Sequence, residues 1–212
     1  MRRVMLGILL TLALPVAALG KSVGFTNSGG TLTGTNGGFA LTGSTLTSVN
    51  GFGGGGVITG NLGTLGLTTG ALTSGSLTMG GTFASGGSFT ITGNGSDGLP
   101  NGTIFSGSFS GPLTWTLVTL NNGTHDYTLA GALTGLYLGV PTNGVTLQLT
   151  VNTGTGFFTG SAAIASGDTD ITIPARHGVV PETGTLGLLS TGLLGIAGFA
   201  RHRARANYSL ER

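Results

Sequence analysis

Apolar and polar residues alternate along the middle of this chain, and this period of two is the feature that most limits its fold. Residues 113–118 read Leu-Thr-Trp-Thr-Leu-Val, and residues 145–151 read Val-Thr-Leu-Gln-Leu-Thr-Val. Such alternation is typical of β-strands that bury one face and expose the other. The alternating segments return at intervals of roughly 8 to 12 residues with turn residues between them, which is typical of a β-sandwich. We therefore expect an all-β fold, an antiparallel β-sandwich with glycine-rich turns.

The first half of the region between the two ends of the chain, residues 25–79, is its most repetitive part. Glycine makes up 44 of the 212 residues, and residues 53–56 are four consecutive glycines that we expect to form a loop. Leucine recurs every five residues at Leu62, Leu67, Leu72 and Leu77. A five-residue period can build a square β-helix, but stacked repeats need about three coils to bury a continuous core. We interpret the repeat as biased composition, with a solenoid as the alternative for this half.

Charged residues are scarce between the two ends of the chain. The central body has two cations, Lys21 and Arg176, against four acids, which are Asp97, Asp126, Asp168 and Asp170. The net charge of +2 for the whole chain therefore comes from its ends, and the body itself is negative. A nucleic-acid-binding protein needs a basic face, so we exclude nucleic acid as a partner. The chain has no cysteine, which excludes disulfides and thiolate metal ligands.

The first 20 residues have the pattern of a secretory signal peptide. Arg2 and Arg3 form a positive region, residues 4–16 are apolar, and Ala18 and Gly20 are small residues suited to cleavage. An apolar stretch of 13 residues is short for a membrane span. We predict a helical signal peptide over residues 1–20, which the secretion translocon and signal peptidase would recognise. A β-rich extracytoplasmic domain over residues 21–173 and a linker over residues 174–179 would follow it.

A second apolar segment lies near the C-terminus, between a short polar signal and a basic cluster. The signal consists of Val180, Pro181, Glu182, Thr183 and Gly184. The apolar run of residues 185–200 would reach about 24 Å as a helix, a little less than a hydrocarbon core of about 30 Å. The basic stop that follows contains Arg201, Arg203 and Arg205, whose long side chains can reach the headgroups. We predict a transmembrane helix within the sorting or anchor segment, residues 180–205, and a polar tail over residues 206–212.

This C-terminal segment resembles the PEP-CTERM sorting domain of exported bacterial proteins, in the order and composition of its signal, its Gly/Leu-rich span and its basic end. The resemblance implies recognition at Pro181 and Glu182 by an exosortase, a membrane-embedded transpeptidase, followed by cleavage and transfer to the cell surface. The family usually has a second proline after the glutamate, where this chain has Thr183. That change also brings the signal close to the Leu-Pro-x-Thr-Gly motif of Gram-positive sortase substrates. A plain C-terminal anchor without processing is a further alternative.

Few residues of the body are candidates for chemistry. Asp168 and Asp170 share one face of an extended segment, and Asp97 lies in a Gly/Asn-rich turn. We expect them to be exposed polar residues of a strand and a turn and predict no metal site, with calcium ligation by these three as the alternative. His125 directly follows an Asn-Gly turn, and we expect it to be a solvated hairpin residue. Trp115 and Tyr127 flank that turn, and we expect them in the core, with an exposed sugar-stacking platform as the alternative. We name no catalytic residue and no cofactor.

These patterns together predict an exported, membrane-sorted surface or extracellular-matrix protein that is not an enzyme. It would be held in the inner membrane during sorting and then reach the cell surface or the extracellular space. The resemblance implies proteins associated with exopolysaccharide, and a surface rich in Gly, Thr, Ser and Asn can form hydrogen bonds with many hydroxyl groups. The alternative is a carbohydrate- or calcium-dependent binding module at the cell surface.

Overall fold

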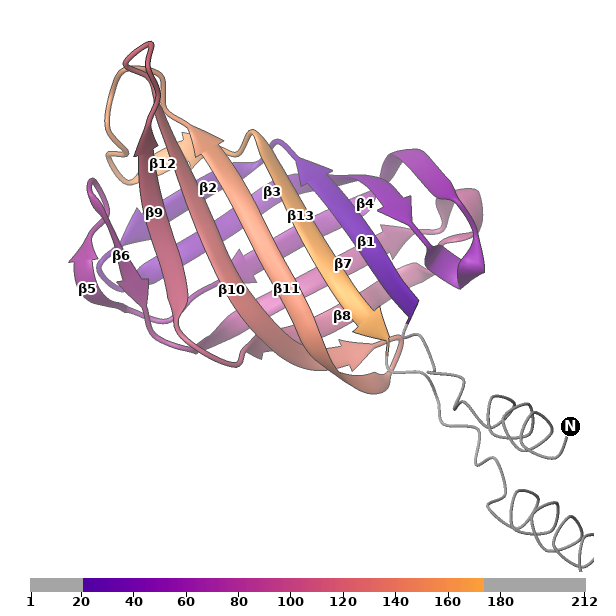
Figure 1. Ribbon diagram of the computed structural model, residues 1–212. Coiled ribbons are helices and arrows are strands. Elements are labelled where there is room, and N and C mark those ends of the chain that lie inside the picture. The colour runs from indigo at the N-terminus through magenta and orange to yellow at the C-terminus, as the bar shows by residue number, and fades with distance from the viewer. Residues whose placement is uncertain (1–20, 174–212) are drawn as a thin grey trace, which may run out of the picture. The chain divides into compact units, whose positions relative to one another are not determined.

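The protein forms a closed antiparallel β-barrel of eight strands. The computed structural model describes residues 21–173, and Figure 1 shows strands wrapped around one interior. The barrel order is β11-β13-β1-β3-β4-β7-β8-β10, and pairing of β10 with β11 closes the sheet. The all-β prediction is confirmed, whereas the prediction of a sandwich is wrong because one sheet closes on itself.

The elements have the following bounds. They are β1 (Lys21–Ser28), β2 (Thr31–Thr35), β3 (Gly38–Asn50), η1 (Phe52–Gly54), β4 (Val57–Thr68), β5 (Leu72–Ser76), β6 (Gly80–Phe83), β7 (Gly86–Asn94), η2 (Ser96–Gly98), β8 (Asn101–Phe109), β9 (Leu113–Thr119), β10 (His125–Tyr137), β11 (Val140–Asn152), β12 (Ser161–Ala163) and β13 (Ser166–Ile173).

The alternation seen in the sequence decides which side chains enter the barrel. In β11, Val145, Leu147, Leu149 and Val151 are buried, whereas Gln148 between them is exposed. The same parity holds in β13, where Thr169 and Ile171 are buried and the residues on either side of each are not. An eight-stranded barrel has an interior just wide enough for side chains to fill. The apolar residues therefore form one core inside the barrel, and threonine and serine cover much of its outer face.

Strand β10 explains how the barrel closes and why it is extended at one end. It pairs with β11 along most of its length. On its other side, His125 to Ala130 pair with β9, and Leu133 to Tyr137 pair with β8. Strands β6 and β5 continue the sheet from β9, while β2 and β12 continue it from β3. One long strand thus belongs both to the closed barrel and to the extension.

Five aromatic side chains pack together where this extension meets the barrel. Phe39 lies 4.6 Å from Phe83 and 4.8 Å from Trp115 between ring centroids, and Trp115 stacks on Tyr127 at 4.8 Å. Phe158, from the segment between β11 and β12, packs edge-on against Trp115 at 5.3 Å. All five rings are nearly inaccessible to solvent. Tilted and offset aromatic pairs of this kind contribute beyond the area they bury.

Glycine lets the strands of this barrel approach closely as well as turn. Gly107 of β8 pairs with Gly135 of β10, at the point where the register between β10 and β11 shifts. A Cβ atom on Gly107 would collide with the carbonyl oxygen of Thr134, and one on Gly135 with that of Ser106. Residues larger than glycine would force β8 and β10 apart here. Glycine is therefore needed where strands pack closely as well as in the turns, where we expected it.

The repetitive first half contains ordinary antiparallel strands, not coils of a solenoid. Leu62 and Leu67 are buried in β4, which pairs antiparallel with β3 and β7. Leu72 lies in β5, and Leu77 lies in the turn that follows it. The solenoid alternative is therefore wrong for residues 25–79. The glycines of residues 53–56 lie in and just after η1, between β3 and β4, so the expected loop is present.

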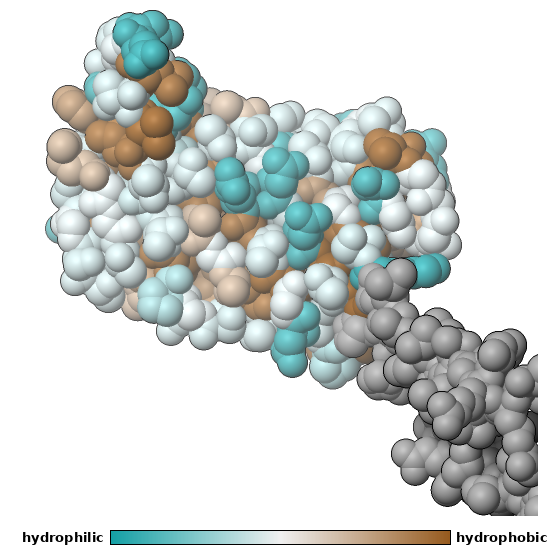
Figure 2. Space-filling view, in the orientation of Figure 1, coloured by the Kyte–Doolittle hydropathy of each residue, from teal (hydrophilic) through white to brown (hydrophobic). Residues whose placement is uncertain are grey.

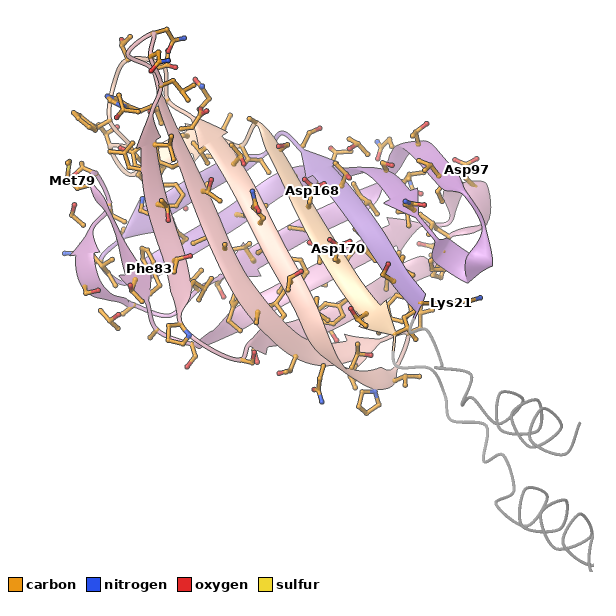
Figure 3. The ribbon with its side chains drawn as sticks, in the orientation of Figure 1. Lys21, Met79, Phe83, Asp97, Asp168 and Asp170 are labelled. Atoms are coloured by element: carbon orange, nitrogen blue, oxygen red, sulfur yellow. The ribbon has the colours of Figure 1, made fainter. Side chains whose placement is uncertain are left out.

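The two ends of the described domain lie next to each other. Lys21, the first residue of β1, pairs with Ile173, the last residue of β13. Figure 3 places Lys21 at one end of the barrel and Met79, in the β5–β6 turn, at the other.

Among residues 21–173, no helix has the length and apolar character needed to cross a membrane. The expected signal helix and the expected transmembrane helix within residues 180–205 lie outside the described residues.

A small polar cluster interrupts the apolar interior. Asn27 and Ser44 are fully buried, and the Asn27 amide donates to the Ser44 hydroxyl at 2.8 Å. The Oδ1 atom of Asn27 and the hydroxyl of Thr169 have no hydrogen-bond partner. Gly167 makes room for Asn27, because a Cβ atom there would collide with the amide. An unpartnered buried hydroxyl lowers stability by about 1–3 kcal/mol.

We expect Thr169→Val to raise the free energy of unfolding by about 1 kcal/mol, because it replaces the unpartnered hydroxyl with a methyl group of similar size. Denaturant unfolding followed by circular dichroism measures the change. Thr69→Val is the matched control, since the Thr69 hydroxyl accepts from the Phe39 N–H at 2.8 Å and donates to the Gly70 carbonyl at 2.9 Å. The control should be destabilised. A loss of stability in both variants would show that the Thr169 hydroxyl has a partner such as an ordered water.

Candidate functional site

The candidate binding site is a groove with mixed polar and apolar lining on the outer face of the barrel, over β10, β11 and β13. Its volume is about 380 Å³, and its lining residues are Ala130, Gly131, Thr146, Leu147, Gln148, Asp168 and Asp170. Figure 2 shows hydrophilic residues in the middle of this face. The groove is open to solvent, so an extended or branched ligand can lie along it.

Strand register brings the polar side chains of the groove together. Asp168 pairs with Gln148, and Asp170 pairs with Thr146. Gln148 in turn pairs with Ala130 of β10, whose small side chain leaves space beside the amide. All the paired residues point outward because they alternate with buried neighbours. The pairing of β11 with β13 therefore forms the site, and it brings together residues about 20 to 25 positions apart in the sequence.

Strand β1 forms the other flank of the two carboxylates. The Thr26 hydroxyl donates to a carboxylate oxygen of Asp168 at 2.9 Å. Gly24 pairs with Asp170 and has no side chain to cover it, since a Cβ atom there would lie 3.2 Å from the carboxylate. Asp168 is therefore oriented by a hydrogen bond, whereas Asp170 is left open toward solvent.

The groove offers hydrogen-bond acceptors on a mostly uncharged surface. Two carboxylates, the Gln148 amide and the Thr146 hydroxyl can together bind the hydroxyl groups of a sugar chain. Charge-assisted hydrogen bonds to the carboxylates would be the strongest of these contacts. The expectation that Asp168 and Asp170 share one face is confirmed by their common exposure on β13.

The three candidate calcium ligands are not brought together. Asp97 lies in η2, and Figure 3 shows it well away from Asp168 and Asp170. Among residues 21–173, no group of three or more His, Cys, Asp or Glu side chains is arranged to hold a metal ion. The other predicted functional residues, which are the sorting signal Val180 to Gly184 and the basic stop, lie outside the described residues.

His125 is not the solvated hairpin residue that its place after the turn predicted. It is only 8% exposed, and its ring stacks on Phe157 with 4.4 Å between centroids. Its Nδ1 atom shares a hydrogen bond of 3.0 Å with the Thr119 hydroxyl. The ring points to the face of β10 that also carries Tyr127, and the loop after β11 covers it. Contacts from a distant segment have therefore overridden the local turn signal.

Trp115 and Tyr127 belong to the core, as the leading prediction stated. Trp115 is 2% exposed and donates its indole N–H to the Leu77 carbonyl at 2.8 Å, while the Tyr127 hydroxyl donates to the Thr78 carbonyl at 2.6 Å. Both polar atoms are thus bonded to the turn after β5, so neither ring forms an exposed platform. The exposed aromatic residue at this end is Phe157, at 46%.

Sequence reasoning missed Thr26, Thr146, Gln148 and Phe157. The first three are ordinary outward residues in their own strands, and only the register places them around the carboxylates. Phe157 precedes the buried Phe158, and the segment between β11 and β12 has no regular alternation to show which ring is exposed.

Comparison of the chain with protein-family models, with curated proteins and with solved structures finds no match.

We expect the fluorescence of Trp115 to report a buried ring. It is the only tryptophan of the chain, so the emission has a single source. The emission should be blue-shifted, poorly quenched by acrylamide, and unchanged when polysaccharide is added, because the indole contacts only protein atoms. Unfolding in denaturant provides the exposed reference. Strong quenching in the folded state would contradict the buried position.

Proposed function

We propose that this protein is an exported, membrane-sorted surface or extracellular-matrix protein without enzymatic activity. The observation that carries the proposal is the C-terminal order of a Val-Pro-Glu-Thr-Gly signal, an apolar run of 16 residues and a basic stop. Its resemblance to PEP-CTERM sorting domains supports recognition by an exosortase-like membrane transpeptidase. The pattern of residues 1–20 supports entry into the secretion pathway.

The extent of the barrel is compatible with this arrangement. The strands that the structure describes lie between Lys21 and Ile173, so cleavage after Ala18 or Gly20, and again near Glu182, would leave all of them in place. Because Lys21 pairs with Ile173, both flanking segments join the barrel at the same place. A folded domain connected in this way can be held by its tail on a membrane.

We expect the protein recovered from its native envelope to end near Pro181–Glu182 and to begin at Leu19 or Lys21. Intact mass spectrometry measures both ends at once. Glu182→Ala and Pro181→Ala remove the two residues that the resemblance assigns to the signal, and these variants should retain Arg212. A wild-type protein that ends at Arg212 would overturn the sorting proposal in favour of a plain anchor. A wild-type protein found inside the cell with both ends intact would overturn export itself.

The groove favours a second function, contact with polysaccharide in the surrounding matrix. Neighbouring strands supply a carboxylate pair, an amide and hydroxyl groups over a depression of about 380 Å³. These groups bind hydroxyls without needing a basic surface, which suits a neutral polysaccharide. The binding partner would then be the exopolysaccharide that PEP-CTERM resemblance suggests.

We expect Gln148→Ala and Asp170→Asn each to weaken binding of exopolysaccharide from the producing cell about fivefold, the effect of losing one hydrogen bond worth about 1 kcal/mol. Isothermal titration calorimetry or co-sedimentation measures the affinity. Asn61→Ala provides a control, because Asn61 is exposed on β4, on a different part of the barrel wall. Equal affinity for all the proteins would remove the groove as the binding site.

A further inference from the structure

The hairpin formed by β9 and β10 has an unpaired strand edge. Strand β6 pairs with β9 only from Leu113 to Trp115, whereas β9 continues to Thr119. In Figure 1 this hairpin projects from the extended end of the barrel. Within the described residues, Gly80 of β6 lies against Trp115 to Leu117, and only the outer edge of residues 118–119 has no neighbouring strand.

The hydrogen-bond pattern shows which backbone groups are free. Leu120 N–H donates to the Thr124 carbonyl at 2.8 Å, so Leu120 and, by alternation, Val118 direct their backbone groups toward β10. His125, which pairs with Thr119, directs its N–H to the Gly154 carbonyl on the other side. Thr119 therefore points its N–H and C=O groups away from β10, along the open edge.

This edge lacks the features that usually prevent strands from pairing with another molecule. Residues 113–124 contain no charged residue and no proline, and the nearest proline is Pro112, directly before the strand. Val118 and Leu120 lie on one face of the strand and are 47% and 40% exposed. Figure 2 shows apolar surface beneath the polar tip of the hairpin. Lysine, proline or a β-bulge normally protects such an edge.

Strand β5, the last strand of the sheet path, is a poorer candidate for pairing. Its ladder with β6 contains a register shift between Leu72 and Ser74, and Gly75 has a φ of 79°. Such irregularities twist a strand edge away from a straight partner. Strand β9 has continuous register with β10 and presents the more regular edge.

We propose that β9 pairs antiparallel with β9 of a second copy of this chain, around a two-fold axis at Thr119. An antiparallel strand pair on a two-fold axis is self-complementary, so the N–H and C=O groups of this edge in one copy pair with those of the same edge in the other. Thr119 would exchange two hydrogen bonds with Thr119 of the second copy. Val118 would face Leu120 of the second copy in a close, non-hydrogen-bonded pair, and each would cover the exposed apolar side chain of the other.

Charge favours a second copy approaching at this edge. The described residues contain one lysine and four aspartates, so two barrels repel each other over the groove but not over the uncharged residues 113–124. Asp126, which pairs with Val118, accepts a 2.6 Å hydrogen bond from the Asn152 amide on β11. Its carboxylate is therefore held on the side away from the open edge.

The decisive test is disulfide cross-linking of the full chain, which has no cysteine of its own. Thr119→Cys should give a covalent dimer on mild oxidation, because paired Cα atoms about 5.5 Å apart lie within disulfide range. Leu120→Cys is the register control. It should remain largely monomeric, since diagonal neighbours are about 7–8 Å apart. No dimer with Thr119→Cys, or equal dimer with both variants, would overturn the proposed pairing.

A second pair of variants tests the edge without a new thiol. In detergent, light scattering of the full chain should give a dimer at tens of micromolar protein, and Val118→Lys should convert it to a monomer. Val57→Lys is the control at a valine of β4 that is even more exposed, at 61%, and it should leave the dimer intact. A wild-type monomer, or a dimer in both variants, would refute the proposal. Circular dichroism checks that each variant is folded, and mass spectrometry of the tail reports sorting separately, so either idea can fail alone.

Discussion

The ladder between β10 and β11 is the interaction on which the rest of this structure depends. It runs from Asp126 opposite Asn152 to Tyr137 opposite Val140 and converts a long sheet into a closed barrel. Closure satisfies backbone groups that an open sheet would leave at its edges, and it creates a single interior for the apolar residues. With few charges and no cysteine, this chain relies on that ladder and on the packed interior for its stability.

Closure also determines what the outer face can do. Once apolar residues fill the barrel, the alternate positions of β11 and β13 must face solvent, and their register places Gln148 and Thr146 opposite the two aspartates. The groove is thus a direct result of strand pairing, with Thr26 from β1 orienting one carboxylate. The interior is not wholly apolar, because Asn27, Ser44 and Thr169 are buried there. Gly167 leaves the space that the Asn27 amide fills.

The alternation of residues was sufficient to predict the strands and much of the core, including Trp115 and Tyr127. It was insufficient to predict a barrel, because whether β10 pairs with β11, β9 and β8 depends on the register of distant segments. The error at His125 has the same origin, since Phe157 covers it from a loop 32 positions later in the chain. The carboxylates of the groove could be identified from their spacing in one strand. Their partners on β1 and β11 could not.

The open edge of β9 is a further result of the way in which β10 closes the barrel. Strand β10 closes the barrel with its second part, and its first part extends beyond the barrel with β9 as a partner. Strand β10 therefore closes the barrel by pairing with β8 and β11, and it also carries β9, whose outer edge is open at the end of the barrel opposite Lys21. If the protein is sorted to one surface as proposed, its copies are concentrated there in two dimensions. Even a short ladder then gains from the high effective concentration of its partner.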